Sequence, residues 1–285
     1  MSAFKFRIYF RIYSLIISGI IVSLKANSQQ SADPQFLQKI QLQRAIVIIK
    51  YQPHEDKFHW EMGGGFIING KYVATCYHIR KAYREKIEQV LILFISNPDA
   101  SSYDTVSADL NYVPAKNQYD FRKHKYDSAD HSTDFIIYKL KRPISNRNPS
   151  YSTKFAKIGD SLFTIANLPK DKNSDFTNTH EVEGRGKYIL AMPEKKQGCN
   201  FYFFINNLQS GFSGSPIYNV NGEIQGIYLF DYPNYNEGFF SELTKHGLSL
   251  PRKKEIEDGY KMGLRLGAYI GIDYLLRTYM EGYLN

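Results

Sequence analysis

Short apolar runs rich in Val, Ile, Phe and Tyr follow one another along most of the chain, and turn residues separate them. Asn69-Gly70 and Asn221-Gly222 each lie between two such runs, which strongly indicates β-hairpins. Because no helical pattern alternates with these runs, the chain is predicted to be all-β, as a sandwich or a pair of barrels. The predicted strands are Ala45–Tyr51, Gly65–Ile68, Tyr72–Thr75, Val90–Ile95, Phe135–Leu140, Ser161–Ala166, Lys187–Met192, Phe201–Ile205, Pro216–Tyr218, Ile224–Phe230 and Leu264–Ile270.

The segments around these runs have a different pattern. Phe36–Gln43 can form one or two helical turns, and Asp273 can cap a terminal helix from Tyr274 to about Tyr283. The polar, proline-bearing stretch Lys141–Thr153 is the expected connection between two lobes. Residues 231–262 are charged and irregular, and we expect an insertion or a long loop there.

Residues 1–28 are expected to be a signal peptide that is not part of the fold. The apolar run Tyr13–Leu24 is too short to cross about 30 Å of hydrocarbon as a helix. Ala26 and Ser28 supply the small residues of a cleavage position. Cleavage implies a secreted or periplasmic protein, and the alternative is a membrane anchor through residues 6–24.

Composition narrows the classes of protein further. The 285 residues are 43% hydrophobic and 22% charged, which excludes a disordered or fibrous protein. Only Cys76 and Cys199 are present, as a disulfide or as two buried thiols, so a cysteine-built metal site is excluded. The net charge of +8 owes four surplus positive charges to residues 1–28, and the rest of the chain gives no indication of a nucleic-acid partner.

Three residues suited to nucleophilic catalysis occur in the order His, Asp, Ser. His78 follows a strand-like run, Asp134 opens another, and Ser213 lies in a tight glycine turn. A serine hydroxyl needs a base to take its proton, and an imidazole oriented by a carboxylate serves near neutral pH. The glycine turn lets the N–H groups of Gly211 and Ser213 point at a developing oxyanion.

Other assignments of the same residues are weaker. Asp127 and Asp130 compete with Asp134 for the role of the acid, but only Asp134 directly opens an apolar strand. Ser215 stands where a nucleophile elbow needs glycine, and the chain order differs from that of the α/β-hydrolases. No HExxH sequence indicates a metalloprotease, and neither a metal nor a cofactor is expected.

From about Ala45 to Asn285 the chain resembles the trypsin-like (chymotrypsin-fold) serine proteases, closest to the bacterial secreted and HtrA-type branch without a PDZ domain. ATCYHI resembles the catalytic-histidine motif, DFIIYKL the aspartate strand, and GFSGSPIYNVNGEIQGIY the serine loop with its hairpin. The resemblance implies two antiparallel β-barrels with the active site in the cleft between them and a C-terminal helix. The implied division is a linker with a short helix over 29–44, a first barrel over 45–145 and a second barrel over 146–285.

The resemblance also implies roles for individual residues. His78 would be the base, Asp134 the orienting acid, Ser213 the nucleophile, and Gly211 with Ser213 the oxyanion hole. Phe212 departs from the family, which has Asp or Asn there; in the digestive-type members that Asp receives a newly freed N-terminus, and Phe212 cannot. The oxyanion loop is therefore formed without processing, or it is ordered by a substrate or partner.

The substrate pocket is expected around Asn207, Leu229, Phe230 and Asp231. Asp231 replaces a glycine of the family, and it either narrows the pocket or offers a carboxylate to a basic residue. The sequence thus predicts an exported serine endopeptidase that acts on protein or peptide substrates through an acyl-enzyme. The alternative is a catalytically silent pseudoprotease that serves as a protein-binding module.

Overall fold

The structure is a computed structural model, and it describes most of the chain beyond residue 32. The described residues are 33–52, 59–80, 86–97, 102–112, 134–145, 147, 149–170, 179–193, 200–208, 211–232, 234, 236–245 and 247–277. The predicted signal peptide, Cys199, Asp127 and Asp130 lie outside the described residues. The chain divides after Leu37, and the strands that the structure describes, β1 to β12, belong to the unit Gln38–Asn285.

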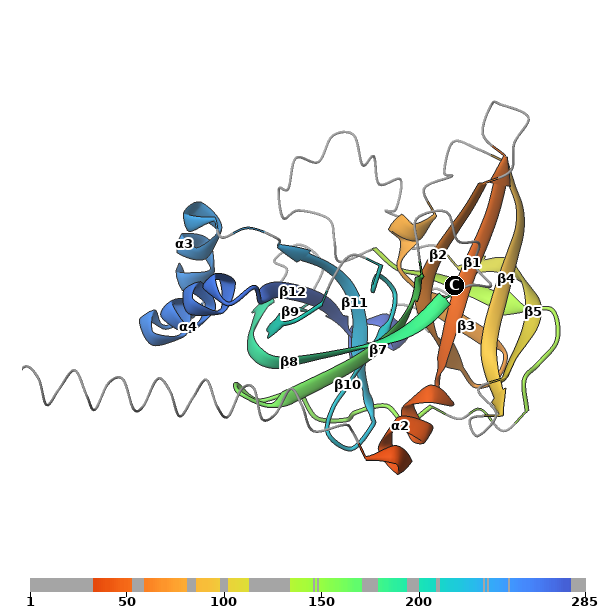
Figure 1. Cartoon of the computed structure of the whole chain (residues 1–285), viewed down its shortest axis with the longest axis horizontal. Coiled ribbons are helices and arrows are strands. Elements are labelled where there is room, and N and C mark those ends of the chain that lie inside the picture. Colours follow the sequence, from red (N-terminus) through yellow and green to blue (C-terminus); the bar gives the residue numbers. More distant parts are fainter. Residues whose placement is uncertain are drawn as a thin grey trace, which may run out of the picture. The chain divides into compact units, whose positions relative to one another are not determined.

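Two closed antiparallel barrels make up this unit, which confirms the predicted all-β, two-barrel fold (Figure 1). The first barrel has the order β1-β2-β3-β6-β5-β4 and the second β10-β11-β12-β9-β8-β7. The first contains β1 (Arg44–Gln52), β2 (His59–Ile68), β3 (Tyr72–Thr75), β4 (Lys86–Asn97), β5 (Ser102–Tyr112) and β6 (Ile136–Leu140). The second contains β7 (Ser161–Pro169), β8 (Thr179–Pro193), β9 (Asn200–Asn206), β10 (Pro216–Tyr218), β11 (Ile224–Tyr232) and β12 (Arg265–Gly271).

Both Asn-Gly pairs form the predicted turns. Asn69 and Gly70 have φ angles of 49° and 64° and join β2 to β3, while Gly222 at 69° lies between β10 and β11. Left-handed backbone of this kind is tolerated by Asn and Gly because their steric cost there is small. The turns therefore set the register of the two hairpins.

Apolar side chains fill the interior of each barrel. Val47, Ile92 and Ile137 of the first barrel are fully buried. The second barrel has a core that is richer in aromatic rings, in which the ring of Phe204 meets those of Tyr228 and Tyr269 edge to face. Burial of these side chains is the main favourable term in folding.

The part of the chain that the structure describes has few helices, and some of them differ from the prediction. α2 (Pro34–Gln41) overlaps the predicted helical turns Phe36–Gln43 in the sequence. Residues 231–262, expected to be irregular, contain α3 (Glu237–Lys245) and α4 (Leu250–Lys261), which precede β12 (Figure 1). Residues 272–277 are helical, so the terminal helix begins before Asp273 rather than being capped by it. Among the described residues, no helix has the length and apolar character that a membrane span requires.

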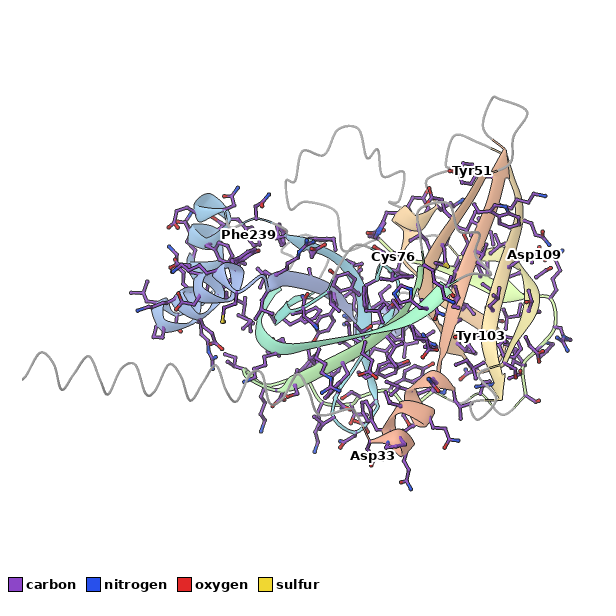
Figure 2. The ribbon with its side chains drawn as sticks, viewed as in Figure 1. Asp33, Tyr51, Cys76, Tyr103, Asp109 and Phe239 are labelled. Atoms are coloured by element: carbon purple, nitrogen blue, oxygen red, sulfur yellow. The ribbon has the colours of Figure 1, made fainter. Side chains whose placement is uncertain are left out.

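A buried arginine joins strands of the two barrels. Arg44 of β1, only 3% exposed, donates to Asn167 Oδ1 at 2.8 Å and to Tyr103 Oη at 3.2 Å, and it forms an ion pair with Glu181 (Figure 2 labels Tyr103). Tyr103 Oη donates in turn to Glu181 at 2.9 Å. Tyr103 belongs to the first barrel, whereas Asn167 and Glu181 belong to the second. The network therefore supplies polar contacts between the barrels.

Replacing this arginine tests the network. We expect Arg44→Met to lower the free energy of unfolding by about 2–4 kcal/mol, because Asn167 and Glu181 lose a buried charged partner. Urea denaturation measures the change. Arg142→Met alters an exposed arginine and should change it by no more than about 0.5 kcal/mol. Equal effects of the two substitutions would contradict a stabilising role of the network.

Candidate active site

Strand pairing brings His78 and Asp134 together. β3 and β6 are antiparallel, with Thr75 opposite Ile136, so the residues after β3 and those before β6 lie at the same barrel end. His78 lies in a short 3₁₀ turn, Tyr77–Ile79, immediately after β3. Asp134 lies two residues before β6.

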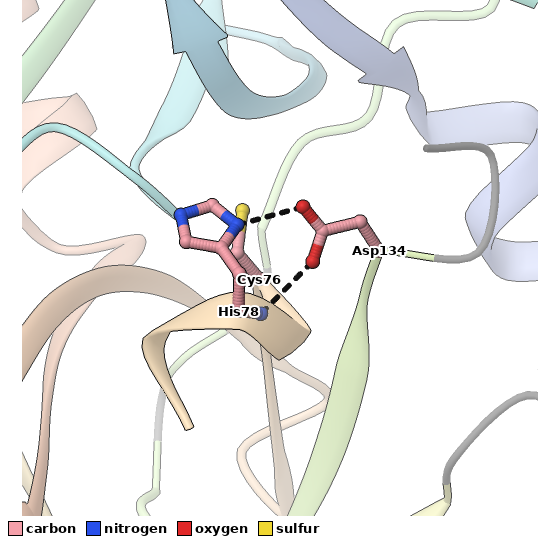
Figure 3. A group of neighbouring side chains, drawn as sticks. All are labelled: Cys76, His78 and Asp134. Atoms are coloured by element: carbon pink, nitrogen blue, oxygen red, sulfur yellow. Dashed lines mark hydrogen bonds and ion pairs between the residues drawn. The ribbon is translucent and has the colours of Figure 1, made fainter. Parts of the chain in front are cut away.

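The Asp134 carboxylate binds His78 through both of its oxygens (Figure 3). His78 Nδ1 lies 2.7 Å from Oδ2, and the His78 backbone N–H donates to Oδ1 at 2.9 Å. The Asp134 side chain is 4% exposed and the His78 side chain is 20% exposed. This arrangement fixes Nδ1 as the protonated nitrogen next to the carboxylate and orients the ring.

Ser213 lies in a turn of the second barrel that contacts the first. Gly64 N of β2 donates to the Ser213 carbonyl at 2.9 Å. At Gly214, with a φ of 81°, a Cβ would collide with the Gly64 carbonyl and the Thr75 hydroxyl, so only glycine fits. The turn is thus packed against the strand that leads to His78.

The side-chain hydroxyl of Ser213 has its own acceptor. Ser213 Oγ donates to the Leu229 carbonyl of β11 at 3.2 Å. Gly211, two residues earlier, has a φ of 104°. Among the described residues, no hydrogen-bond acceptor is found for the backbone N–H groups of Gly211 and Ser213. These two donors are therefore available to a bound group.

Cys76 lies beside this group, and the sequence did not predict that placement (Figure 3; Figure 2 labels it in the whole molecule). Its thiol is fully buried and donates to the Tyr228 carbonyl at 3.0 Å. Burial raises the pKa of the Cys76 thiol well above its usual range, and the Asp134 carboxylate raises it further. Its position directly after the strand Tyr72–Thr75, two residues before His78, is the sequence feature that could have indicated it.

Cys76, His78 and Asp134 also form a group that could be considered for a metal ion, with their ligand atoms within 4.8 Å of one another. A metal would need a thiolate from Cys76, whose raised pKa keeps it protonated. It would also displace the hydrogen bond between His78 Nδ1 and Asp134. The three residues therefore fit a hydrogen-bonded site better than a metal centre.

The four residues of the predicted substrate pocket differ in how far they are exposed to solvent. Asn207 is exposed, and its Oδ1 accepts from the Arg185 backbone N–H at 3.0 Å. Leu229 is fully buried, while Phe230 is half-buried. Asp231 forms an ion pair with Arg265 at 2.6 Å. Its carboxylate is therefore already paired within the protein and is not free to bind a basic residue of a substrate. Arg265 is 34 residues away in the chain, and no sequence pattern indicated it.

Phe212, the residue that departs from the resembled family, is directed away from solvent. It is 1% exposed and belongs to the core of the second barrel. Its ring meets that of Tyr228 edge to face, with 6.5 Å between centroids. The side chain next to Ser213 is therefore part of the hydrophobic core.

Comparison with solved structures finds the same two-barrel architecture elsewhere. Rv3671c protease from M. tuberculosis in its active form has a TM-score of 0.53 and 13% identity, over 87% of this chain and 83% of that one. A serine-to-alanine mutant of Rv3671c in an inactive form gives 0.51 and 12%, over 88% and 91%. The inactive form of Rv3671c protease gives 0.50 and 12%, over 88% and 93%.

These likenesses define the class of fold. The chain has the chymotrypsin-like two-barrel fold. No protein-family model matches the sequence, and no curated protein matches it either. Closeness to the HtrA-type branch is not supported by these comparisons.

The burial of Cys76 predicts an unreactive thiol. In a Cys199→Ser variant, we expect Ellman's reagent at about pH 8 to modify no thiol in the folded protein, because a free thiol titrates near pH 8.5 and Cys76 above it. Adding urea should release one reactive thiol. Rapid modification without urea would mean that Cys76 is accessible, whereas a Cys76→Ser, Cys199→Ser variant provides the blank.

Proposed function

We propose that the protein is a serine endopeptidase that hydrolyses peptide bonds through an acyl-enzyme. The observation that carries this proposal is the buried Asp134 carboxylate bound to His78 Nδ1 at 2.7 Å, next to a serine turn held against the same strand end. An imidazole oriented in this way can act as a base through its second nitrogen, Nε2. The two-barrel fold, which the Rv3671c protease structures share, is compatible with this chemistry.

The proposed reaction begins at the Ser213 hydroxyl. Ser213 Oγ leaves the Leu229 carbonyl, gives its proton to His78 Nε2 and attacks the carbonyl carbon of the scissile bond. Asp134 stabilises the imidazolium that forms, without itself taking the proton. His78 then gives the proton to the leaving amine, and the acyl-enzyme is hydrolysed by a water molecule that His78 activates in the same way.

The oxyanion of the tetrahedral intermediate needs donors that are already in position. The Gly211 and Ser213 N–H groups, with no acceptor among the described residues, suit this role. Loss of one such donor typically costs about 10²–10³ in turnover. The expected partners are protein or peptide substrates, without a cofactor, a metal or a nucleic acid.

A second function is favoured by one specific contact. Ser213 Oγ donates to the Leu229 carbonyl, a bond that competes with transfer of its proton to His78. If that bond persists, the chain is a catalytically silent pseudoprotease that binds proteins with its two-barrel surface. The two functions differ in the reactivity of a single hydroxyl.

The proposal includes export. Residues 1–28 lie outside the described residues, and the sequence pattern alone supports a signal peptide. We propose a secreted or periplasmic protein, with an anchor through residues 6–24 as the alternative. The size of the mature protein in a cell fractionation distinguishes the two.

Labelling with a fluorophosphonate tests the proposed function, because such probes react with a serine that a base has activated. We expect the protein to be labelled, and Ser213→Ala and His78→Ala to abolish labelling while the circular dichroism spectrum stays unchanged. Asp134→Asn should slow labelling by about 10⁴, because it favours the wrong tautomer of His78. Absence of labelling in a well-folded protein would favour the binding function.

The ion pair of Asp231 predicts how substrate preference can be changed. Leu229, whose carbonyl accepts from Ser213, lies two residues from Asp231, so a residue next to the scissile bond would pass close to the pair. We expect Arg265→Met to leave the carboxylate unpaired and to raise the relative cleavage of peptides with Lys or Arg before the cut by about tenfold.

Peptide libraries that vary this residue measure the preference. The double variant Asp231→Asn, Arg265→Met removes both charges and should lose the gain. An unchanged preference in Arg265→Met would mean that the pair does not contact the substrate.

A further inference from the structure

Phe212 stands between the two proposed oxyanion donors, Gly211 and Ser213, and its side chain is anchored in the core. It is 1% exposed. The core cluster around it consists of Leu162, Ala166, Tyr188, Phe204, Leu208, Ile217, Tyr228 and Tyr269. The backbone on either side of Phe212 is therefore tied to a rigid, close-packed interior.

Hydrogen bonds hold the residues that follow Phe212. The Phe212 carbonyl accepts from Ser215 N at 2.9 Å, and the Gly214 N–H donates to the Tyr228 carbonyl at 2.8 Å. Tyr228 N donates back to the Ser215 carbonyl at 2.9 Å. Tyr228 thus binds the turn through its backbone and packs against Phe212 through its ring.

Gly211 supplies the bend on the other side. Its φ of 104° is a conformation that side chains rarely adopt, and a Cβ there would collide with Leu168. With Gly211 bent and Phe212 buried, the peptide N–H groups before and after the ring have fixed directions.

We propose that Phe212 is the positioning residue of the oxyanion loop, and that core packing of its ring forms this loop without proteolytic release of a new N-terminus. The inference rests on the proposed function for its catalytic meaning. The sequence left two states open, a loop formed without processing and a loop ordered by a substrate or partner, and the proposal selects the first. A phenyl ring has no group that could accept an amine, so the device differs from an ion pair with a freed terminus.

Substitution of Phe212, with a matched core residue as the control, tests the proposal. Phe204 belongs to the same cluster, is equally buried and contacts Tyr228, but it is a residue of β9 and not of the turn. Phe212→Ala and Phe204→Ala remove the same atoms from one core. Phe212→Leu and Phe204→Leu remove fewer atoms from the core, and they replace the alanine variants if either of those does not fold.

We expect Phe212→Ala to lower the maximal fluorophosphonate labelling rate by about 100-fold at an unchanged half-saturating probe concentration, as for the loss of an oxyanion donor. Phe212→Leu should recover most of the rate. Phe204→Ala should reduce the fraction of protein that is folded, yet label at the wild-type rate per folded molecule. Equal rates in the Phe212 and Phe204 variants would overturn the proposal.

Hydrogen–deuterium exchange over residues 211–218 gives a readout that does not depend on catalysis. Exchange should accelerate in the Phe212 variants and remain slow in the Phe204 variants, whether or not the wild type is labelled. A wild type without labelling refutes the proposed function, while the exchange result still decides whether Phe212 orders the loop.

A second experiment tests whether a free N-terminus is needed. The full chain with an uncleavable N-terminal tag should label as fast as the untagged chain, because no free amine is needed. Labelling of the untagged chain together with no labelling of the tagged chain would overturn the proposal.

Discussion

The carbonyl oxygen of Tyr228 is the point on which the candidate site depends. It accepts the Gly214 N–H at 2.8 Å and the Cys76 thiol at 3.0 Å, one from the serine turn and the other from the segment that leads to His78. A single acceptor on β11 thus joins the two halves of the site. Because Leu229 follows directly, the same strand also supplies the acceptor of the Ser213 hydroxyl.

Much of the fold was predictable because its strands are short, apolar and separated by turn residues. β5 was missed, since its sequence SYDTVSADLNY is polar and most of its side chains are exposed or half-exposed. α4 was missed for a similar reason, because LPRKKEIEDGYK has many charges and buries only Ile256 and Gly259. Elements with little buried surface leave a weak hydrophobic pattern in the sequence.

The sequence predicted the candidate residues of the site, but it did not predict the hydrogen bonds and ion pairs that join them to the rest of the fold. The proximity of His78 and Asp134 follows from the pairing of Thr75 with Ile136. The apolar runs predicted both strands, whereas the relation between the two residues was predicted from their order in the chain and from the resemblance to a protease family. The Asp231–Arg265 pair and the thiol of Cys76 against Tyr228 depend on the register and curvature of several strands. Single-chain patterns do not encode such contacts between distant segments.

The meeting of Gly64 with the turn at Gly214 has a consequence for how this protein can change over time. At both positions an added methyl group would collide with the other barrel, against backbone atoms and the small hydroxyl groups of Ser215 and Thr75. Side chains in either core can then be exchanged, one apolar residue for another, without altering the spacing of the barrels at that point. Substitutions in the two cores can therefore leave the geometry of the site unchanged, whereas any side chain at Gly64 or Gly214 would alter it.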